Sequence, residues 1–113
     1  MNSAEIVQKQ VEAYNTRNLE MFLACHAEDV QLFRFSESTP YSVGKEKLKN
    51  VYKDVFENSP NLHTNIVNRM VMGNIVIDHE VVSGRKGVET STIIAIFEIE
   101  NGLISKARFI REK

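Results

Sequence analysis

Three side chains capable of acid–base chemistry stand in a row, Asp78-His79-Glu80, in a stretch otherwise rich in valine and isoleucine. Successive side chains of a strand point to opposite faces, so Asp78 and Glu80 share one face and His79 lies on the other. Two carboxylates on one face can act as a general base, or as a pair in which one pKa is raised. The alternative is a structural role, in which they neutralise Arg34 or lie at a solvated rim.

Arg34 is a second candidate, because it belongs to a short strand pattern, Val30–Phe35. Its place in the alternation predicts that it points toward the core. A buried guanidinium needs an anionic partner, and Asp78 and Glu80 are the carboxylates expected on an inward strand face. We therefore expect Arg34 to pair with one of them, or to hold the carboxylate or enolate of a ligand in a bidentate way.

Two tyrosines, Tyr14 and Tyr52, fall on the apolar faces of expected helices. Such tyrosines are more often core residues than catalytic acids. The three histidines lack the spacing of metal ligands, so we expect no metal site. We also expect no organic cofactor. The single cysteine, Cys25, is expected to be a small core residue.

Apolar stripes at helical spacing predict the helices that must position these residues. Asn2 can cap the first helix, with Glu5 completing a capping box. The expected elements of the first half are a helix over 2–17, a short helix from Leu19 closed by Ala27-Glu28-Asp29, the strand Val30–Phe35, a loop over 36–44 and a helix over Lys45–Asn58.

The second half is rich in β-branched residues and is divided by glycine and asparagine turn signals, which predicts a run of strands. Their connections are too short for crossover helices, so the sheet is expected to be antiparallel. Helices followed by such a sheet give an α+β fold. The expected strands are Asn65–Met72, Ile75–Ser83, Glu89–Glu100 and Leu103–Arg111.

The longest expected strand, Glu89–Glu100, is apolar on both faces through its middle. One face carries Ile93, Ala95, Phe97 and Ile99, and the other carries Thr92, Ile94 and Ile96. One face can meet the core, whereas the other needs a cover. We therefore expect a homodimer that forms through the sheet.

The length of 113 residues suits one domain, residues 1–113. With a net charge of −1, the chain lacks the excess of positive charge that is typical of proteins that bind nucleic acid or an anionic membrane. No apolar run approaches the ~20 residues that span a bilayer, and the first residues lack the basic and apolar segments of a signal peptide. We expect a cytoplasmic protein with no nucleic-acid or membrane partner.

The order of elements and four short motifs resemble the SnoaL-like branch of the nuclear transport factor 2-like superfamily. The resemblance implies a cystatin-like, cone-shaped fold, in which three N-terminal helices pack on a curved antiparallel sheet around a pocket. Members include isomerases, cyclases, hydrolases and binding domains, so function has to be argued from the site. The motifs are Tyr14-Asn15-Thr16-Arg17-Asn18-Leu19-Glu20, Ala27-Glu28-Asp29-Val30, Gly44-Lys45-Glu46 and Gly102-Leu103-Ile104.

Ketosteroid isomerases resemble this chain in the same motifs and use an aspartate base with an oxyanion hole of a tyrosine and a protonated aspartic acid. The resemblance puts Gln10 at the tyrosine position and Arg34 at the base position, with Ile93 or Ala95 at the second acid. An arginine cannot accept a proton at neutral pH. Since losing one oxyanion donor alone costs ~10²–10³ in rate, we expect no ketosteroid isomerisation above background.

The resemblance also turns the face of Asp78 and Glu80 toward the pocket and matches Tyr52 to a pocket tyrosine. The first hypothesis is an enzyme that acts on an apolar or carbonyl-bearing metabolite by acid–base chemistry, as an isomerase, cyclase or hydrolase does. The second is a small-molecule-binding module, and the third is an interaction domain whose cavity is filled by aromatic residues, Phe33 among them. The candidate catalytic residues are Asp78 and Glu80, and the candidate ligand-binding residues are Arg34, Tyr14, Tyr52 and Gln10.

Overall fold

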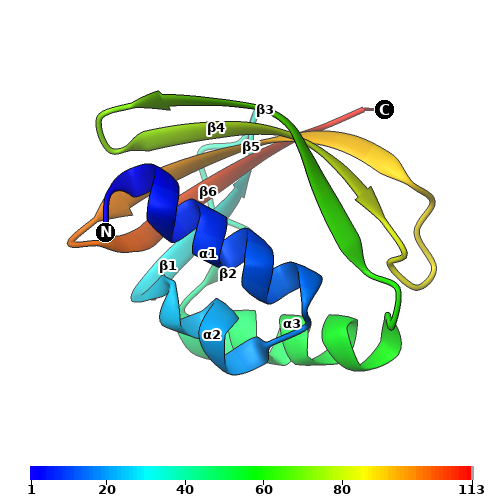
Figure 1. Ribbon diagram of the computed structural model, residues 1–113. Coiled ribbons are helices and arrows are strands. Elements are labelled where there is room, and N and C mark those ends of the chain that lie inside the picture. Colours follow the sequence, from blue (N-terminus) through cyan, green and yellow to red (C-terminus); the bar gives the residue numbers. More distant parts are fainter. Residues whose placement is uncertain (113) are drawn as a thin grey trace.

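Three helices cover the concave face of one curved, six-stranded sheet in the computed structural model (Figure 1). The structure describes residues 1–112, so Lys113, the last residue of the expected domain, lies outside the described part. The expected α+β arrangement is confirmed. In chain order the elements are α1 (Ser3–Asn15), α2 (Leu19–Ala24), β1 (His26–Arg34), β2 (Ser42–Val43), α3 (Lys45–Asn58), β3 (His63–Met72), β4 (Ile75–Ser83), β5 (Ser91–Glu100) and β6 (Leu103–Arg111).

The strand order in the sheet is β2-β1-β6-β5-β4-β3. The hairpins from β3 to β6 are antiparallel, as their short connections predict. The pairing of β1 with β6 differs from the expected antiparallel arrangement, because these two strands run parallel. They are far apart in sequence, and α3 together with four strands lies between them, so the limit on short connections does not apply to this pair.

The boundary between α2 and β1 also differs from the expected one. The helix ends at Ala24 and the strand already begins at His26, four residues before Val30. His26 pairs with Ile104 of β6, and the Ile104 amide donates to the Cys25 carbonyl at 2.9 Å. Tertiary pairing with β6 thus extends the strand through Ala27-Glu28-Asp29, where local propensity favours a helix end.

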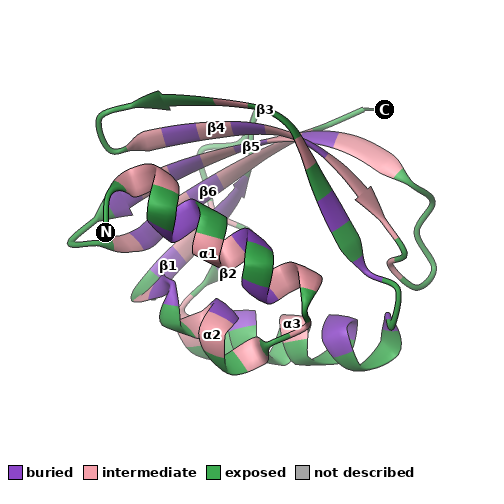
Figure 2. Ribbon diagram, viewed as in Figure 1, coloured by how far each residue is buried: buried purple, intermediate pink, exposed green. Residues whose placement is uncertain are grey.

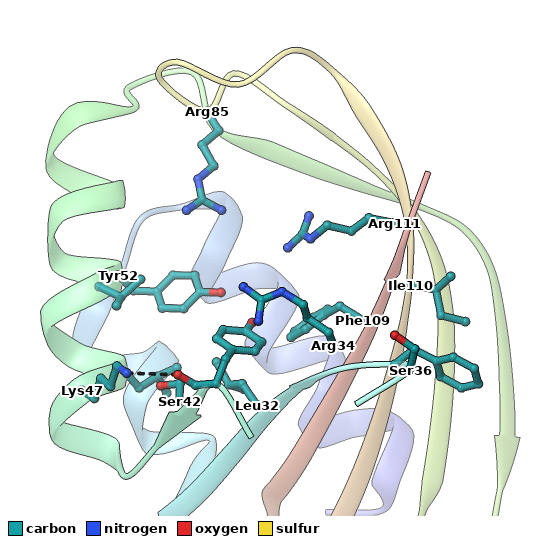
Figure 3. Close-up of a pocket in the computed structure, with 14 residues that line it drawn as sticks. Leu32, Arg34, Ser36, Ser42, Lys47, Tyr52, Arg85, Phe109, Ile110 and Arg111 are labelled. Atoms are coloured by element: carbon teal, nitrogen blue, oxygen red, sulfur yellow. Dashed lines mark hydrogen bonds between the residues drawn. The ribbon is translucent and has the colours of Figure 1, made fainter. Parts of the chain in front are cut away.

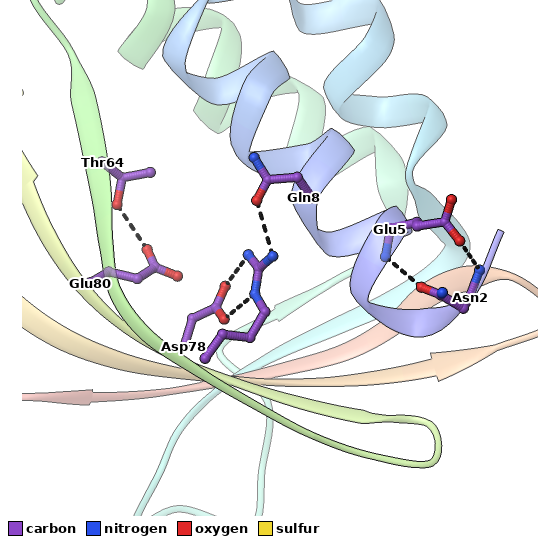
Figure 4. Close-up of polar contacts among 7 residues, drawn as sticks. Asn2, Glu5, Gln8, Thr64, Asp78 and Glu80 are labelled. Carbon is purple, nitrogen blue, oxygen red and sulfur yellow. Dashed lines mark hydrogen bonds and ion pairs between the residues drawn. The ribbon is translucent and has the colours of Figure 1, made fainter.

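The first helix begins as the sequence predicts. The Glu5 amide donates to the Asn2 side chain at 2.9 Å, and the Asn2 amide donates to the Glu5 carboxylate at 3.1 Å, which forms a capping box (Figure 4). An apolar stripe of this helix packs on the concave face of the sheet (Figure 2). The buried residues of α1 are Ile6, Val7, Val11 and Ala13.

The core lies between the helices and the sheet and extends into a cluster of aromatic rings. Phe22 of α2 packs against Tyr52 of α3 with ring centroids 4.6 Å apart, and Tyr14 lies 5.9 Å from Phe56. These contacts fix both tyrosines at the edge of the core. Among the helices of residues 1–112, none is both long enough and apolar enough to span a membrane.

Candidate functional site

Two adjacent cavities lie between the helices and the concave face of the sheet. The outer cavity has a volume of about 650 Å³ and opens beside α3 and the ends of β1 and β6 (Figure 3). The inner cavity has a volume of about 60 Å³ and reaches from α1 to β4. The two cavities are neighbours and share part of their walls. The shared lining residues are Leu32, Leu48, Tyr52, Arg85, Phe109 and Arg111.

Glu80 projects from β4 into the inner cavity. Its side chain is almost wholly buried, and the hydroxyl of Thr64 donates to the carboxyl group at 3.1 Å (Figure 4). Burial raises the pKa of Glu80 to about 7, and the hydrogen bond from Thr64 only partly offsets that effect. A carboxyl group with this pKa is present in both protonation states near neutral pH, so it can give and take protons.

Asp78 shares the inward face of β4 but lines neither cavity. Arg69 of β3 holds its carboxylate with two hydrogen bonds, at 2.6 Å from Nε and 2.9 Å from Nη2. The same guanidinium donates to Gln8 of α1 at 3.0 Å (Figure 4). The bond to this carboxylate raises the pKa of Arg69 further. Both oxygens of Asp78 are occupied, which suits a structural ion pair rather than proton transfer.

The expected pairing of Arg34 with Asp78 or Glu80 is wrong. The Arg34 side chain is 66% exposed, lies 3.4 Å from the Glu37 carboxylate, and stacks over the Tyr41 ring at 5.0 Å. Its expected face is correct, because Arg34 lines the outer cavity together with Leu32. Because β1 ends at Arg34, this residue of the inward face lies at the open mouth of the outer cavity. Its charge is exposed there and needs no buried partner.

Tyr14, Tyr52 and Gln10 all line the inner cavity. Burial raises the pKa of both tyrosines, so their hydroxyls stay protonated at neutral pH and can donate hydrogen bonds. The Tyr52 side chain also lines the outer cavity, and its hydroxyl points into that cavity (Figure 3). The Oε1 atom of Gln10 is buried and has no hydrogen-bond partner among residues 1–112. Since a buried polar atom is costly to leave unpaired, Gln10 is ready to bind a polar group of a ligand or a water molecule.

His26 also lines the inner cavity, and the sequence reasoning did not single it out as a site residue. Its Nδ1 atom lies 2.7 Å from the Phe22 carbonyl oxygen, which can only accept, so Nδ1 carries the proton and Nε2 is left as an acceptor. Burial lowers the pKa of His26 to about 4, which keeps the ring neutral. Recognising that the strand starts at His26 instead of Val30 would have revealed this inward position.

Three further cations line the outer cavity and were also missed as site residues: Lys47 of α3, Arg85 of the β4–β5 loop and Arg111 of β6. Arg111 follows Ala107 and Phe109 in the inward alternation of β6, so strand parity was the signal that could have found it. Arg85 offered no such signal, because it lies in the loop between β4 and β5. Within residues 1–112, no three His, Cys, Asp or Glu side chains gather as metal ligands would.

Solved structures with similar folds come from several bacteria. An uncharacterized cystatin-fold protein from Novosphingobium aromaticivorans is 21% identical, with a TM-score of 0.89, and the match covers 98% of this chain and 99% of that one. A SnoaL-like protein of unknown function from Burkholderia thailandensis is 17% identical, with coverage of 98% and 94% and a TM-score of 0.79. A candidate polyketide cyclase from Sinorhizobium meliloti is 17% identical, with coverage of 94% of each chain and a TM-score of 0.78.

At these identities the structural likeness shows the fold alone, and it confirms the cystatin-like arrangement expected from the sequence. No curated protein sequence matches the chain. The sequence model of the family described as the SnoaL-like domain matches residues 7–107, nearly the whole chain. The chain therefore belongs to the SnoaL-like domain family.

Proposed function

We propose that this SnoaL-like protein is an enzyme that binds a small, apolar, carbonyl-bearing metabolite in its two cavities and moves a proton on it with Glu80. The observation that carries this proposal is the Glu80 carboxyl group, which lies in an inner cavity with its pKa raised to about 7. A general base or acid works best when its pKa is near the working pH. The reaction is then of the isomerase, cyclase or hydrolase type.

In the simplest step, the Glu80 carboxylate takes a proton from a carbon next to the substrate carbonyl. The electron pair of the broken C–H bond moves to the carbonyl oxygen and forms an enolate. The hydroxyl of Tyr52 or Tyr14 donates a hydrogen bond to that oxygen, because both hydroxyls stay protonated. The protonated Glu80 then returns the proton to the same or another carbon.

Gln10 and His26 support this proposal as orienting groups. The unpaired Gln10 Oε1 and the neutral His26 offer fixed hydrogen-bonding atoms on the wall of the inner cavity. Fixed polar groups in a mostly apolar cavity select the orientation of a ligand. One solved structure with this fold is named as a candidate polyketide cyclase, and carbon–carbon cyclisation of a poly-carbonyl chain also begins with loss of a proton beside a carbonyl.

Deuterium exchange tests the proton transfer without knowledge of the natural substrate. Ketones that contain an aromatic ring, such as β-tetralone, are incubated with the protein in D₂O, and the C–H signals next to the carbonyl are followed by NMR. We expect exchange above the buffer rate that falls at least about a hundredfold in Glu80→Gln, within the usual contribution of a positioned base. The matched control, Glu12→Gln, changes an exposed glutamate of α1 and should exchange like the wild type.

A binding module without turnover is the second candidate, and one observation favours it. The inner cavity that holds Glu80 has room for about two water molecules, whereas the larger outer cavity does not include Glu80. A ligand confined to the outer cavity would be held and not converted. Tight binding of these ketones with no exchange in wild-type protein would contradict the enzyme proposal and support this one.

The third hypothesis was an interaction domain whose cavity is filled by aromatic residues. It has little support, because Phe33 does not line the outer cavity and packs under Arg108 instead.

A further inference from the structure

The wall of the outer cavity carries an unbalanced positive charge. Its charged lining residues are Arg34, Lys47, Arg85 and Arg111, and no Asp or Glu of the described residues 1–112 lines it. The chain as a whole has a net charge of −1, so this concentration is local and does not reflect a basic protein. The four cations come from β1, α3, the β4–β5 loop and β6, so four separate parts of the chain converge on one opening (Figure 3).

Protein groups neutralise this charge only in part. Arg34 has Glu37 as a distant and exposed partner at 3.4 Å, and Lys47 donates to the neutral Tyr41 carbonyl at 3.0 Å. Arg85 is half-buried, and neither Arg85 nor Arg111 forms an ion pair within residues 1–112. Bringing like charges together around a cavity costs free energy unless an anion enters between them.

The positive field reaches into the cavities. Arg85 and Arg111 both oppose the burial-driven rise in the pKa of Tyr14 and of Tyr52, which shows that the guanidinium groups lie close enough to favour negative charge there. Figure 3 shows both guanidinium groups turned toward the space in front of the Tyr52 hydroxyl. Guanidinium groups bind the oxygens of carboxylates and phosphates through paired N–H donors.

Apart from Ser36 and Ser42, the rest of the wall is apolar or aromatic. It includes Leu32, Leu48, Val51, Phe109 and the ring of Tyr52. An apolar wall with a charged rim fits a ligand that has an apolar body and one charged end. The small inner cavity has room only for the apolar end of such a ligand. The charged end then remains among the arginines while the apolar end approaches Glu80.

We propose that the ligand of this site is an amphipathic organic anion, with an apolar ring or chain in the cavities and a carboxylate or phosphate group held at the mouth by Arg85 and Arg111, with Arg34 and Lys47 beside them. This inference rests on the proposed function of the same cavity and adds the class of molecule it takes.

A pair of fluorescent probes tests the charge requirement directly. Anilinonaphthalene sulfonate and phenyl naphthylamine share the same aromatic body, and only the first carries an anionic group. We expect the anionic probe to bind wild-type protein at least about tenfold more tightly at low salt. This preference should shrink as salt is raised, since exposed charges are screened.

The variant Arg85→Gln/Arg111→Gln should lose the preference for the anionic probe while it still binds the neutral probe. The control Lys49→Gln/Lys53→Gln removes the same amount of charge from the exposed part of α3, where neither side chain lines the two cavities, and should keep the preference. Naphthoate and naphthyl phosphate, used as competitors, then identify the preferred anionic group. Circular dichroism of each variant checks that it is folded.

Equal binding of the two probes, or equal losses in both double variants, would overturn the anion proposal and leave the role of Glu80 standing. Failure of both competitors to displace the anionic probe would also overturn it, because the probe would then bind elsewhere. If neither probe binds wild-type protein, the anion proposal and the proposed ligand-binding function fail together.

Discussion

Glu80 and Asp78 lie two residues apart on the inward face of β4, and their partners give them different chemistry. Asp78 is held by the Arg69 guanidinium through two short hydrogen bonds. Glu80 has only a neutral hydroxyl donor, Thr64, and its pKa is raised by burial. A charged partner stabilises an ionised carboxylate, whereas burial beside a neutral donor leaves it close to protonation. Glu80 is therefore the residue we assign to proton transfer.

The raised pKa of Glu80 also predicts a pH-dependent cost in stability. The group has a pKa of about 4.5 when unfolded and about 7 when folded, so the folded state binds more protons between these values. The stability due to Glu80 is complete below pH 4.5 and is lost as the pH rises to about 7. Glutamine mimics the protonated acid at every pH. The free energy of unfolding of Glu80→Gln, relative to that of wild type, should therefore rise by about 2 kcal/mol between pH 5 and pH 8.

Urea unfolding of both proteins at the two pH values measures this difference. The contributions of the other titrating groups to the free energy of unfolding are common to both proteins and cancel. Glu12→Gln, at an exposed position, should show no such change. A difference between wild type and Glu80→Gln that stays the same at both pH values would show that Glu80 has an ordinary pKa in the fold.

The Arg69–Asp78 ion pair predicts a large loss of stability when only one partner is removed. Arg69→Met leaves the fully buried Asp78 carboxylate unpaired, which should cost roughly 3–5 kcal/mol in the free energy of unfolding. The double variant Arg69→Met/Asp78→Asn should recover much of that loss. Arg34→Met is the comparison, because the exposed Arg34–Glu37 pair is worth at most about 1 kcal/mol. Similar losses for Arg34→Met and Arg69→Met in chemical denaturation would refute this assignment.

Part of the site could be predicted from residue spacing. Periodicity put Tyr14 and Tyr52 on the apolar faces of their helices and Glu80 on the same strand face as Asp78, because helix and strand repeats fix the face of a side chain. The family resemblance then turned that strand face toward the pocket. The partner of Asp78 could not be predicted. A register shift between Ile66 and Asn68 of β3 brings Arg69 opposite Asp78, and simple alternation does not reveal such a shift.

At the scale of elements, the end of α1 is tied to the start of β3 beside the inner cavity. The Asn15 side chain donates to the Thr64 carbonyl at 3.0 Å and accepts from the Thr64 amide at 2.7 Å. The Thr64 hydroxyl in turn donates to Glu80. The position of the helix is therefore coupled to the donor that faces the titrating acid.

The loop that carries Arg85 is fixed by a close backbone approach at Gly84. This glycine has φ +76°, and a Cβ atom there would overlap the Asn61 carbonyl group. Gly87, in the same loop, also has φ +76° but has open space around it. We expect Gly87→Ala to cost about 1–2 kcal/mol through backbone strain alone.

Gly84→Ala should cost clearly more than Gly87→Ala, because the loop must also move away from Asn61, and it should weaken binding of the anionic probe by displacing Arg85. Thermal unfolding and probe titration of the two variants measure both effects. Equal stability and equal probe affinity in Gly84→Ala and Gly87→Ala would mean that this contact does not position the loop.

Most elements of the fold were accessible from the sequence, because capping, apolar stripes and glycine turns act locally. The capping box at Asn2 and the span of α3 are the clearest cases. The early start of β1 and its parallel pairing with β6 were missed, since both depend on contacts between distant segments. The two-residue strand β2 arises in the same way, by pairing of Val43 with Gln31 inside an expected loop.

At the scale of the whole molecule, the convex face of the sheet carries a mostly apolar row of side chains that runs across neighbouring strands. Pairing puts Met70 beside Ile77, Ile77 beside Ile96, and Ile96 beside Arg108, which pairs with Phe33. Met70 is 58% exposed although it is large and apolar. Apolar side chains on this face would gain from burial against a second copy of the sheet.

We propose that two copies of the protein associate through this convex face. Light scattering behind a sizing column should give about twice the chain mass of 12.9 kDa at micromolar concentration. Ile96→Arg should give the monomer mass, because it puts a charge in the middle of the row, while Val51→Arg on α3 should leave the mass unchanged. A monomer mass for wild-type protein would contradict the proposed dimer.

The central claim is that Glu80 is a titrating acid inside the protein, and its pKa is the most direct test. The side-chain carboxyl carbons of ¹³C-labelled protein are followed by NMR from acid to alkaline pH, and the Glu80 signal is identified by its loss in Glu80→Gln. We predict a midpoint near pH 7, well above the ordinary glutamate value of 4.5. A midpoint near 4.5 would contradict the account, because Glu80 would then be an ordinary carboxylate with no special capacity for proton transfer.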